Sequence, residues 1–171
     1  MDNETIKYII QNKKYKMTFD DYLNYWFLFF PIAIIVIGYS MFDNYFNFHN
    51  GLTILFLSLL FIALGLFSFF FILMRLIANN AFITIPNDKM LDVDKFVDNL
   101  KCKINLSSIN VNKELKAINA VTKVTAFSWG EELTIIFDDA FVLINSRPNS
   151  SNQPITIFKD KKNISLIKQI L

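Results

Sequence analysis

Two long apolar runs, separated by a short polar connection, constrain this chain more than any other feature of its sequence. The first run is Tyr25 to Phe42 and has no charged residue, and the second is Leu52 to Ala78 and has only Arg75. A helix needs about 20 apolar residues to cross a bilayer core, with a usual range of about 17–25. Soluble core helices are rarely apolar on every face over this length. The sequence therefore predicts a membrane hairpin of two transmembrane α-helices over 25–78, with an outer loop at 43–51.

The positions of the basic residues predict which way the hairpin faces. Before the first run lie Lys7, Lys13, Lys14 and Lys16, and around and after the end of the second lie Arg75, Lys89, Lys95, Lys101 and Lys103. The connection between the runs has no Lys or Arg. Basic residues near the spans stay on the cytoplasmic side during insertion. We therefore expect the bacterial cytoplasmic (inner) membrane as the location, with both termini in the cytoplasm.

The segment 1–24 before the first run has two readings that its sequence leaves open. Ile6, Ile9 and Ile10 recur at helical spacing and Lys13 and Lys14 follow them. Such a helix suits the inner leaflet, where apolar residues enter the interface and basic residues meet anionic lipid. It suits equally a helix that packs on the soluble part of the protein. The segment is thus either interfacial or part of a cytoplasmic domain.

Residues 79–171 have ordinary polarity and predict a small cytoplasmic α+β domain with an antiparallel sheet. We expect a strand at 81–86, an amphipathic helix at 92–103, a β-hairpin at 133–144 that turns at Asp138 and Asp139, and a closing helix at 160–171. Residues 113–126 fit a helix weakly, and their β-branched side chains favour a strand. The turn-forming residues 145–154 indicate a loop. The expected order is β-α-β-β-β-α.

The chain lacks the motifs of an enzyme. Its one histidine, His49, lies in the expected outer loop, and its four glycines form no phosphate-binding pattern. The single cysteine, Cys102, excludes an intrachain disulfide. Asp138 and Asp139 are adjacent, so in a strand they would face opposite sides, and a turn explains them better than a metal site. We expect no catalytic residue, no cofactor and no metal, and a net charge of +2 argues against nucleic acid as a partner.

The expected loop after the hairpin is the best candidate for ligand binding. It contains Arg147 among small polar residues, and the candidate set is Arg147, Ser146, Asn145 and Asn149. A guanidinium helped by backbone N–H groups binds phosphate or carboxylate, so the expected ligand is a small anion or an unknown protein partner on the cytoplasmic side. The competing reading is that Arg147 pairs with Glu131 or Asp160 on an exposed loop.

Small residues in the apolar runs predict where helices pack. These are Gly38, Ala63, Gly65 and Ser68. In lipid, small side chains let two helix backbones approach closely. We expect them first to pack the hairpin against itself and second to form contacts in a homo-oligomer, with the lipid bilayer as the surrounding partner.

Two short stretches carry a resemblance to a known family. They are KYKMTFDDYLNYW, which leads into the first run, and SWGEELTI in the β-rich part. With the hairpin, they resemble the YcxB-like and pleckstrin-homology-like two-helix membrane proteins of bacteria. The likeness ends after Asn145. It implies a membrane-anchored, non-enzymatic domain and transfers no binding residue.

The resulting hypothesis is a non-enzymatic inner-membrane accessory or regulatory protein whose cytoplasmic domain binds a partner or ligand. One alternative is a ligand-triggered two-helix effector that disrupts the membrane in an antiphage nucleotide-signalling system. A second alternative is an immunity protein that captures a toxin.

Overall fold

The computed structural model describes residues 1–48, 51–87, 93–125, 129–149 and 159–171. The chain forms two compact units, and the first is discontinuous in sequence: it comprises Met1–Thr18 and Ala78–Leu171. The second unit is Phe19–Ile77, inserted between those two parts. The soluble domain expected at 79–171 therefore also includes the N-terminal residues.

The inserted unit consists of two long apolar helices, as the sequence predicts. The first begins with α2 (Phe19–Asn24) and the 3-10 helix η1 (Tyr25–Leu28) and continues as α3 (Phe29–Phe48), and the second is α4 (Leu52–Asn80). Both have the length and hydropathy to cross a membrane. Their large apolar side chains are mostly outside, with Phe56 and Phe67 68% and 74% exposed. An apolar surface of this kind is stable only in an apolar surrounding.

The prediction of an outer loop at 43–51 is wrong for residues 43–48, because α3 continues through Asp43 to Phe48. No Pro or Gly occurs between Gly38 and Gly51, so the chain has nothing there that would end the helix. His49 and Asn50 lie outside the described residues.

The two predicted glycine contacts lie inside the hairpin. A Cβ atom added at Gly65 would be 2.5 Å from Ile35 Cγ1, and one added at Gly38 would be 2.9 Å from Ile62 Cγ1. Both glycines thus mark close approaches between α3 and α4. Ala63 is exposed, and the hydroxyl of Ser68 donates to the carbonyl of Leu64 in its own helix at 2.6 Å.

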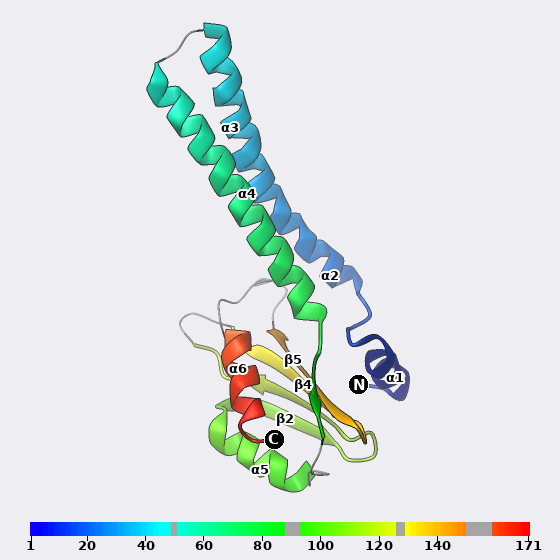
Figure 1. Cartoon of the computed structure of the whole chain (residues 1–171). Helices are drawn as coiled ribbons and strands as arrows, with labels where there is room; N and C mark the ends of the chain where they lie inside the picture. Colours follow the sequence, from blue (N-terminus) through cyan, green and yellow to red (C-terminus); the bar gives the residue numbers. More distant parts are fainter. Residues whose placement is uncertain (49–50, 88–92, 126–128, 150–158) are drawn as a thin grey trace. The chain divides into compact units, whose positions relative to one another are not determined.

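The first, discontinuous unit, which we call the soluble unit after its expected location, is built on a five-stranded antiparallel sheet (Figure 1). Its strands are β1 (Ile83–Pro86), β2 (Leu106–Asn112), β3 (Ala117–Thr122), β4 (Glu131–Phe137) and β5 (Phe141–Pro148), and their spatial order is β1-β5-β4-β3-β2. The hairpin that turns at Asp138 and Asp139 is confirmed as β4 and β5.

The predicted element order is right except for one missing strand. Of the strand predicted at 113–126, residues 117–122 form β3, and Lys113–Lys116 form the turn before it. The order β-α-β-β-β-α omitted β2, so the sheet has one strand more than expected. The register of β2 on β3 shifts between Leu106 and Ser108. This irregularity breaks the period-two alternation by which strands are recognised.

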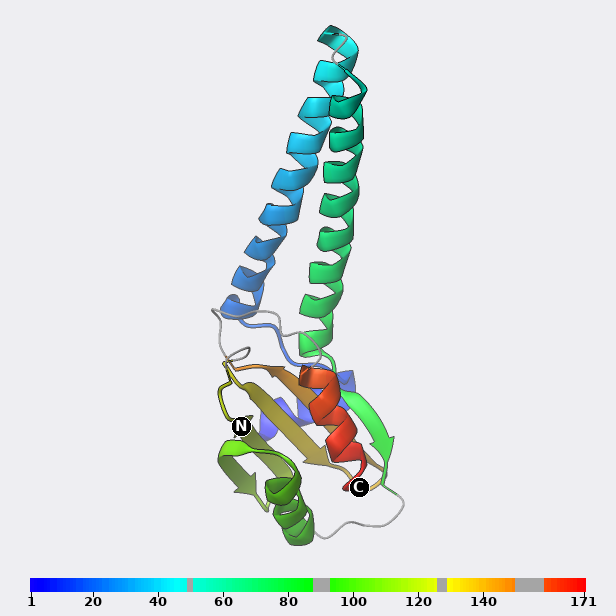
Figure 2. The same cartoon turned by 90° about the vertical axis from the view of Figure 1, so that its left-hand side faces the viewer.

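Two helices cover one face of the sheet. These are α5 (Val93–Lys103) and α6 (Lys159–Lys168), close to the helices predicted at 92–103 and 160–171. Phe96 and Leu100 of α5 and Ile167 of α6 are fully buried against inward side chains of the central strands. Figure 2 shows α6 in front of the sheet and α1 behind it.

The opposite face carries α1 (Asn3–Asn12), which settles the open reading of the N-terminal segment. Ile6 and Ile9 of α1 are buried against Ile136 and Leu143 of the central strands. Asp2 caps the helix by accepting a hydrogen bond from the backbone N–H of Thr5 at 2.8 Å. The hydrogen bond with the Thr5 side chain, and then the one with this N–H, lower the pKa of the Asp2 carboxyl. The helix therefore packs on the protein's own domain.

Candidate functional site

The face of the sheet that carries α1 is apolar at one end and polar at the other. Side chains alternate along a strand, so Thr134 shares this face with Ile136 on β4, and Arg147 shares it with Leu143 on β5. The register places Glu132 opposite Arg147 and Thr134 opposite Asn145. The α1 helix covers the apolar end. The polar residues of β4 and β5 thus come together beyond the helix.

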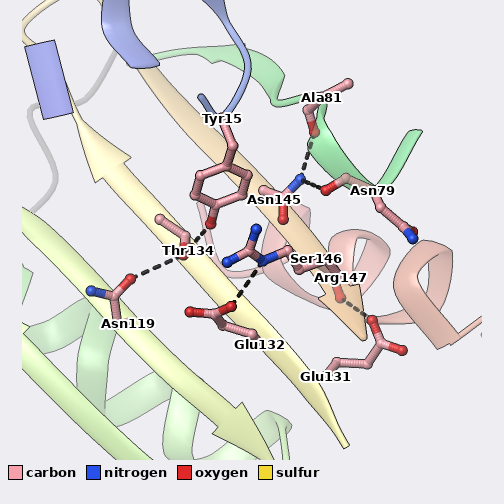
Figure 3. Close-up of polar contacts among 10 residues, drawn as sticks. All are labelled: Tyr15, Asn79, Ala81, Asn119, Glu131, Glu132, Thr134, Asn145, Ser146 and Arg147. Carbon is pink, nitrogen blue, oxygen red and sulfur yellow. Dashed lines mark hydrogen bonds and ion pairs between the residues drawn. The ribbon is translucent and has the colours of Figure 1, made fainter. Parts of the chain in front are cut away.

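Arg147 lies at the centre of this polar end. Its Nε–H donates to Glu132 Oε2 at 2.8 Å, and its guanidinium carbon is 4.1 Å from the ring centroid of Tyr15 (Figure 3). Phe82 packs on the same ring, with centroids 4.8 Å apart. The side chains of Arg147 and Glu132 are only 26% and 32% exposed. The pair therefore faces solvent through a limited opening.

A chain of buried hydrogen bonds fixes Tyr15 over the strands. Its hydroxyl donates to Thr134 Oγ1 at 2.6 Å, and the Thr134 hydroxyl donates to Asn119 Oδ1 at 2.9 Å (Figure 3). Asn119 belongs to β3, so the chain links the N-terminal segment to two strands. Since buried polar groups are stable only when they are hydrogen-bonded, this chain holds the aromatic ring in one position.

These residues form a pocket of about 520 Å³, which we call the Tyr15 pocket. The sheet contributes Asn119, Glu132, Thr134 and Arg147. The N-terminal part contributes Met1, Thr5, Tyr15, Lys16, Met17 and Thr18. Ligand pockets are commonly about 300–1,000 Å³. The Tyr15 pocket thus has the size and the polar groups to hold a small polar molecule.

The segments that lead to and from the helical hairpin are paired with each other, and we call this pairing the clasp. The Tyr15 N–H donates to the Asn80 carbonyl at 2.9 Å, and the Phe82 N–H donates to the Lys13 carbonyl at 2.8 Å. The Asn145 side chain then donates to the carbonyls of Asn79 and Ala81, at 2.9 and 2.7 Å. The clasp therefore holds both segments on the strands that line the pocket.

The predicted ligand residues divide between the two faces of the sheet. The expected loop at 145–154 is wrong for 145–148, which belong to β5, and 150–158 lie outside the described residues. Arg147 and Asn145 share the pocket face, although Asn145 serves the clasp. Ser146 points the other way. Asn149 is exposed just beyond the strand, and its N–H donates to the Gly130 carbonyl at 3.2 Å.

Ser146 belongs to a buried polar cluster beneath α6. Its hydroxyl donates to Glu131 Oε2 at 3.1 Å and accepts from Asn163 Nδ2 at 3.2 Å. Burial lowers the pKa of the nearby Lys159 ammonium, and the charge of Glu131 opposes that shift. The cluster joins the helix to the sheet, so Ser146 has a structural contact rather than a place in the pocket.

Of the residues that line the pocket, sequence reasoning proposed only Arg147. It missed the sheet residues Asn119, Glu132 and Thr134 and all six residues of the N-terminal part, Tyr15 among them. A signal for two of them was present, because the turn at Asp138 and Asp139 sets the register of the hairpin. That register alone places Glu132 beside Arg147. No comparable signal exists for Tyr15, which reaches β4 across 119 positions of sequence.

The described part of the chain contains no group of three or more His, Cys, Asp or Glu residues placed to hold a metal ion. A family-model scan, a search of curated proteins and a search of solved structures each found no match to this chain.

Proposed function

We propose that this protein is a non-enzymatic accessory or regulatory protein of the bacterial inner membrane, whose cytoplasmic unit binds a ligand or partner at the membrane surface. One observation carries the proposal. The Tyr15 pocket is lined by Lys16, Met17 and Thr18, and the next residue, Phe19, begins the first apolar helix. A molecule in this pocket contacts the segment of the chain that leads into the first apolar run.

Three features support this function. The exposed apolar surface of the hairpin suits lipid. Lys and Arg residues flank the hairpin on both sides, whereas the connection between its two helices has none. This distribution favours a cytoplasmic position for both termini. The clasp connects the two membrane-proximal segments to the strands of the pocket. Binding and anchoring therefore meet at the same strands, as a sensing or recruiting protein requires.

The proposed topology predicts the result of reporter fusions. A reporter joined after Asn47 is expected to report the periplasm, and one joined at Leu171 is expected to report the cytoplasm. The reason is that all Lys and Arg residues near the spans lie away from the connection between α3 and α4. Alkaline phosphatase and a fluorescent protein, each fused at both sites, should give opposite signals, so each reporter checks the other. A cytoplasmic signal from the Asn47 fusion would refute the proposed orientation.

Binding at the pocket predicts a ligand-dependent melting temperature. We expect one member of a panel of nucleotides, amino acids and phosphorylated metabolites to stabilise the full chain in detergent micelles. A ligand at 100 times its Kd contributes about 2.7 kcal/mol. Arg147→Ala should remove this stabilisation, measured as the ligand-induced shift relative to the variant's own melting temperature, because the variant also loses the ion pair with Glu132 and the contact with the Tyr15 ring.

The matched control is Lys113→Ala, which breaks an ion pair with Asp94 outside the pocket, where both side chains are about two-thirds exposed. This variant should keep the full ligand response. If Arg147→Ala responds to the ligand as the unmodified protein does, the ligand does not bind at the Tyr15 pocket.

A further inference from the structure

We propose that the Tyr15 pocket binds a small zwitterion in which an anionic phosphate or carboxylate is joined by a short linker to a primary ammonium group. The inference rests on the proposed function and names the ligand class of the same site. Such a group occurs in the headgroup of an aminophospholipid and also in free solutes. The chemistry that recognises it is the same in both cases.

The charges on the pocket wall favour a zwitterion over a simple anion. Arg147 and Glu132 stand side by side, joined by the 2.8 Å contact from Nε to Oε2. An anion that approaches the guanidinium must also approach the Glu132 carboxylate, and like charges at this range repel. A simple cation that approaches the Glu132 carboxylate must likewise approach the Arg147 guanidinium, which repels it. A zwitterion places its anionic oxygens on Arg147 and its ammonium on Glu132, so each charge has an opposite partner.

The donors around the pocket match the same pattern. Lys16 adds a second cationic group to the lining, and a cation suits phosphate or carboxylate oxygens. Glu132 is the only acidic residue of the lining within the described part of the chain, so it marks the place for the ligand's ammonium. The hydrogen bonds from Tyr15 to Thr134 and from Thr134 to Asn119 hold the floor rigid. A preformed floor reduces the ordering cost of binding.

The position of the pocket in the chain admits both sources of the ligand. Thr18 lines the pocket and Phe19 begins the first apolar helix. If the hairpin spans the bilayer, lipid headgroups lie within reach of this segment. A free solute reaches the same pocket from the cytoplasm. The experiment must therefore separate the two sources as well as test the chemistry.

The test uses two soluble headgroup analogues that share a phosphodiester and a positively charged nitrogen and differ in the methylation of that nitrogen. Glycerophosphoethanolamine carries a primary ammonium, whereas glycerophosphocholine carries a trimethylated nitrogen with no N–H. Isothermal titration of the full chain in detergent micelles should show that the first binds about tenfold or more tightly than the second. This is the scale of one charge-assisted hydrogen bond to Glu132. Glycerol phosphate, which lacks the ammonium, should also bind more weakly by about that factor.

The decisive variant is Glu132→Gln, which keeps the shape of the side chain and removes its charge. It should bring the affinities for the three probes to within about threefold of one another, because a neutral amide no longer selects an ammonium. Asp94→Asn is the matched control, since it removes an exposed carboxylate from an ion pair elsewhere in the unit, and it should keep the preference. Melting curves of both variants confirm that each is folded.

Nanodiscs then identify the source of the ligand. With a lipid headgroup as the ligand, discs that contain phosphatidylethanolamine should weaken the titrated affinity several-fold compared with pure phosphatidylcholine discs, through competition. With a free solute as the ligand, the two discs should give equal affinities.

The inference is overturned if none of the probes binds at millimolar concentration, if all three bind equally to the unmodified protein, or if Glu132→Gln keeps the preference. Each of these results leaves the membrane topology and any Arg147-dependent ligand from the metabolite panel untouched. A failure of the ligand class is thus distinguishable from a failure of the proposed function.

Discussion

Ile9→Ala is expected to destabilise the soluble unit and to open the Tyr15 pocket. Ile9 is fully buried between α1 and the sheet, beside Ile136 and Leu143. Truncation of a buried Ile to Ala typically costs about 2–5 kcal/mol, from lost transfer free energy and the remaining cavity. Because α1 lies at the N-terminal end of the unit, this loss should appear first as detachment of the helix.

Amide hydrogen exchange of the intact protein in nanodiscs measures this effect. Residues Asn3–Asn12 should lose most of their protection in Ile9→Ala, whereas the central strands β4 and β5 should keep theirs. Lys7→Ala is the control, because Lys7 is exposed on the same helix. If α1 were embedded in the lipid interface instead, Ile9→Ala would leave the stability of the soluble unit unchanged, and that result would contradict the packing described here.

The same variant should weaken ligand binding at the pocket. Met1 and Thr5 line the pocket from the N-terminal part, and α1 leads directly into Tyr15. With the helix detached, these groups must be ordered again whenever a ligand binds, and this ordering costs free energy. We therefore expect a lower affinity in Ile9→Ala even though no residue that faces the ligand's charges has changed.

Gly65→Leu is expected to separate the two helices of the hairpin. A Cβ atom at Gly65 would lie 2.5 Å from Ile35 Cγ1 and 3.0 Å from both the Ile35 nitrogen and the Pro31 carbonyl oxygen. Two of these three atoms belong to the backbone, so a rotamer change cannot relieve the overlap. Overpacking typically costs about 1–3 kcal/mol when side chains can adjust. The backbone contacts here should make the cost larger.

Spin-label distances between α3 and α4 measure the separation. Labels on Tyr39→Cys and Leu60→Cys, in a Cys102→Ser background, occupy exposed positions on the two helices. Gly65→Leu should lengthen and broaden the distance distribution in nanodiscs. Ala63→Leu is the matched control, because Ala63 is exposed two residues away, and it should leave the distribution unchanged. Identical distributions for Gly65→Leu and the unmodified hairpin would rule out the tight contact.

These two positions also separate hairpin packing from oligomerisation. Gly65 contacts α3, so its replacement disturbs the packing of the hairpin itself. Ala63 faces outward, and a Leu there changes only a surface that a second copy could use. A membrane-disrupting effector that works by oligomerisation would lose its toxicity in Ala63→Leu while the spin-label distances stay normal.

The features that depend on local pattern could be predicted from the amino-acid sequence alone. Two long apolar runs, with Arg75 as their one charged residue, predicted the two helices, because crossing a bilayer depends on length and hydropathy, which are additive along the chain. The amphipathic spacing predicted α5 and α6, and the alternation around Asp138 and Asp139 predicted the β4–β5 hairpin. Each of these signals is complete within about 30 residues of sequence or fewer.

The contacts between residues far apart in the sequence could not be predicted in this way, because they depend on the folded sheet. The side chains of Ile6 and Ile9 suit lipid and protein equally, and the choice depended on the apolar patch formed by Ile136 and Leu143. The sequence predicted Arg147 in a loop, with Glu131 or Asp160 as its possible ion-pair partner. It lies instead in β5 and pairs with Glu132, because the turn-forming residues around it conceal the strand. Tyr15 became a pocket residue through a hydroxyl contact to Thr134, a contact that no local pattern encodes. Burial free energy depends on the partner surface, and that surface exists only once the sheet has formed.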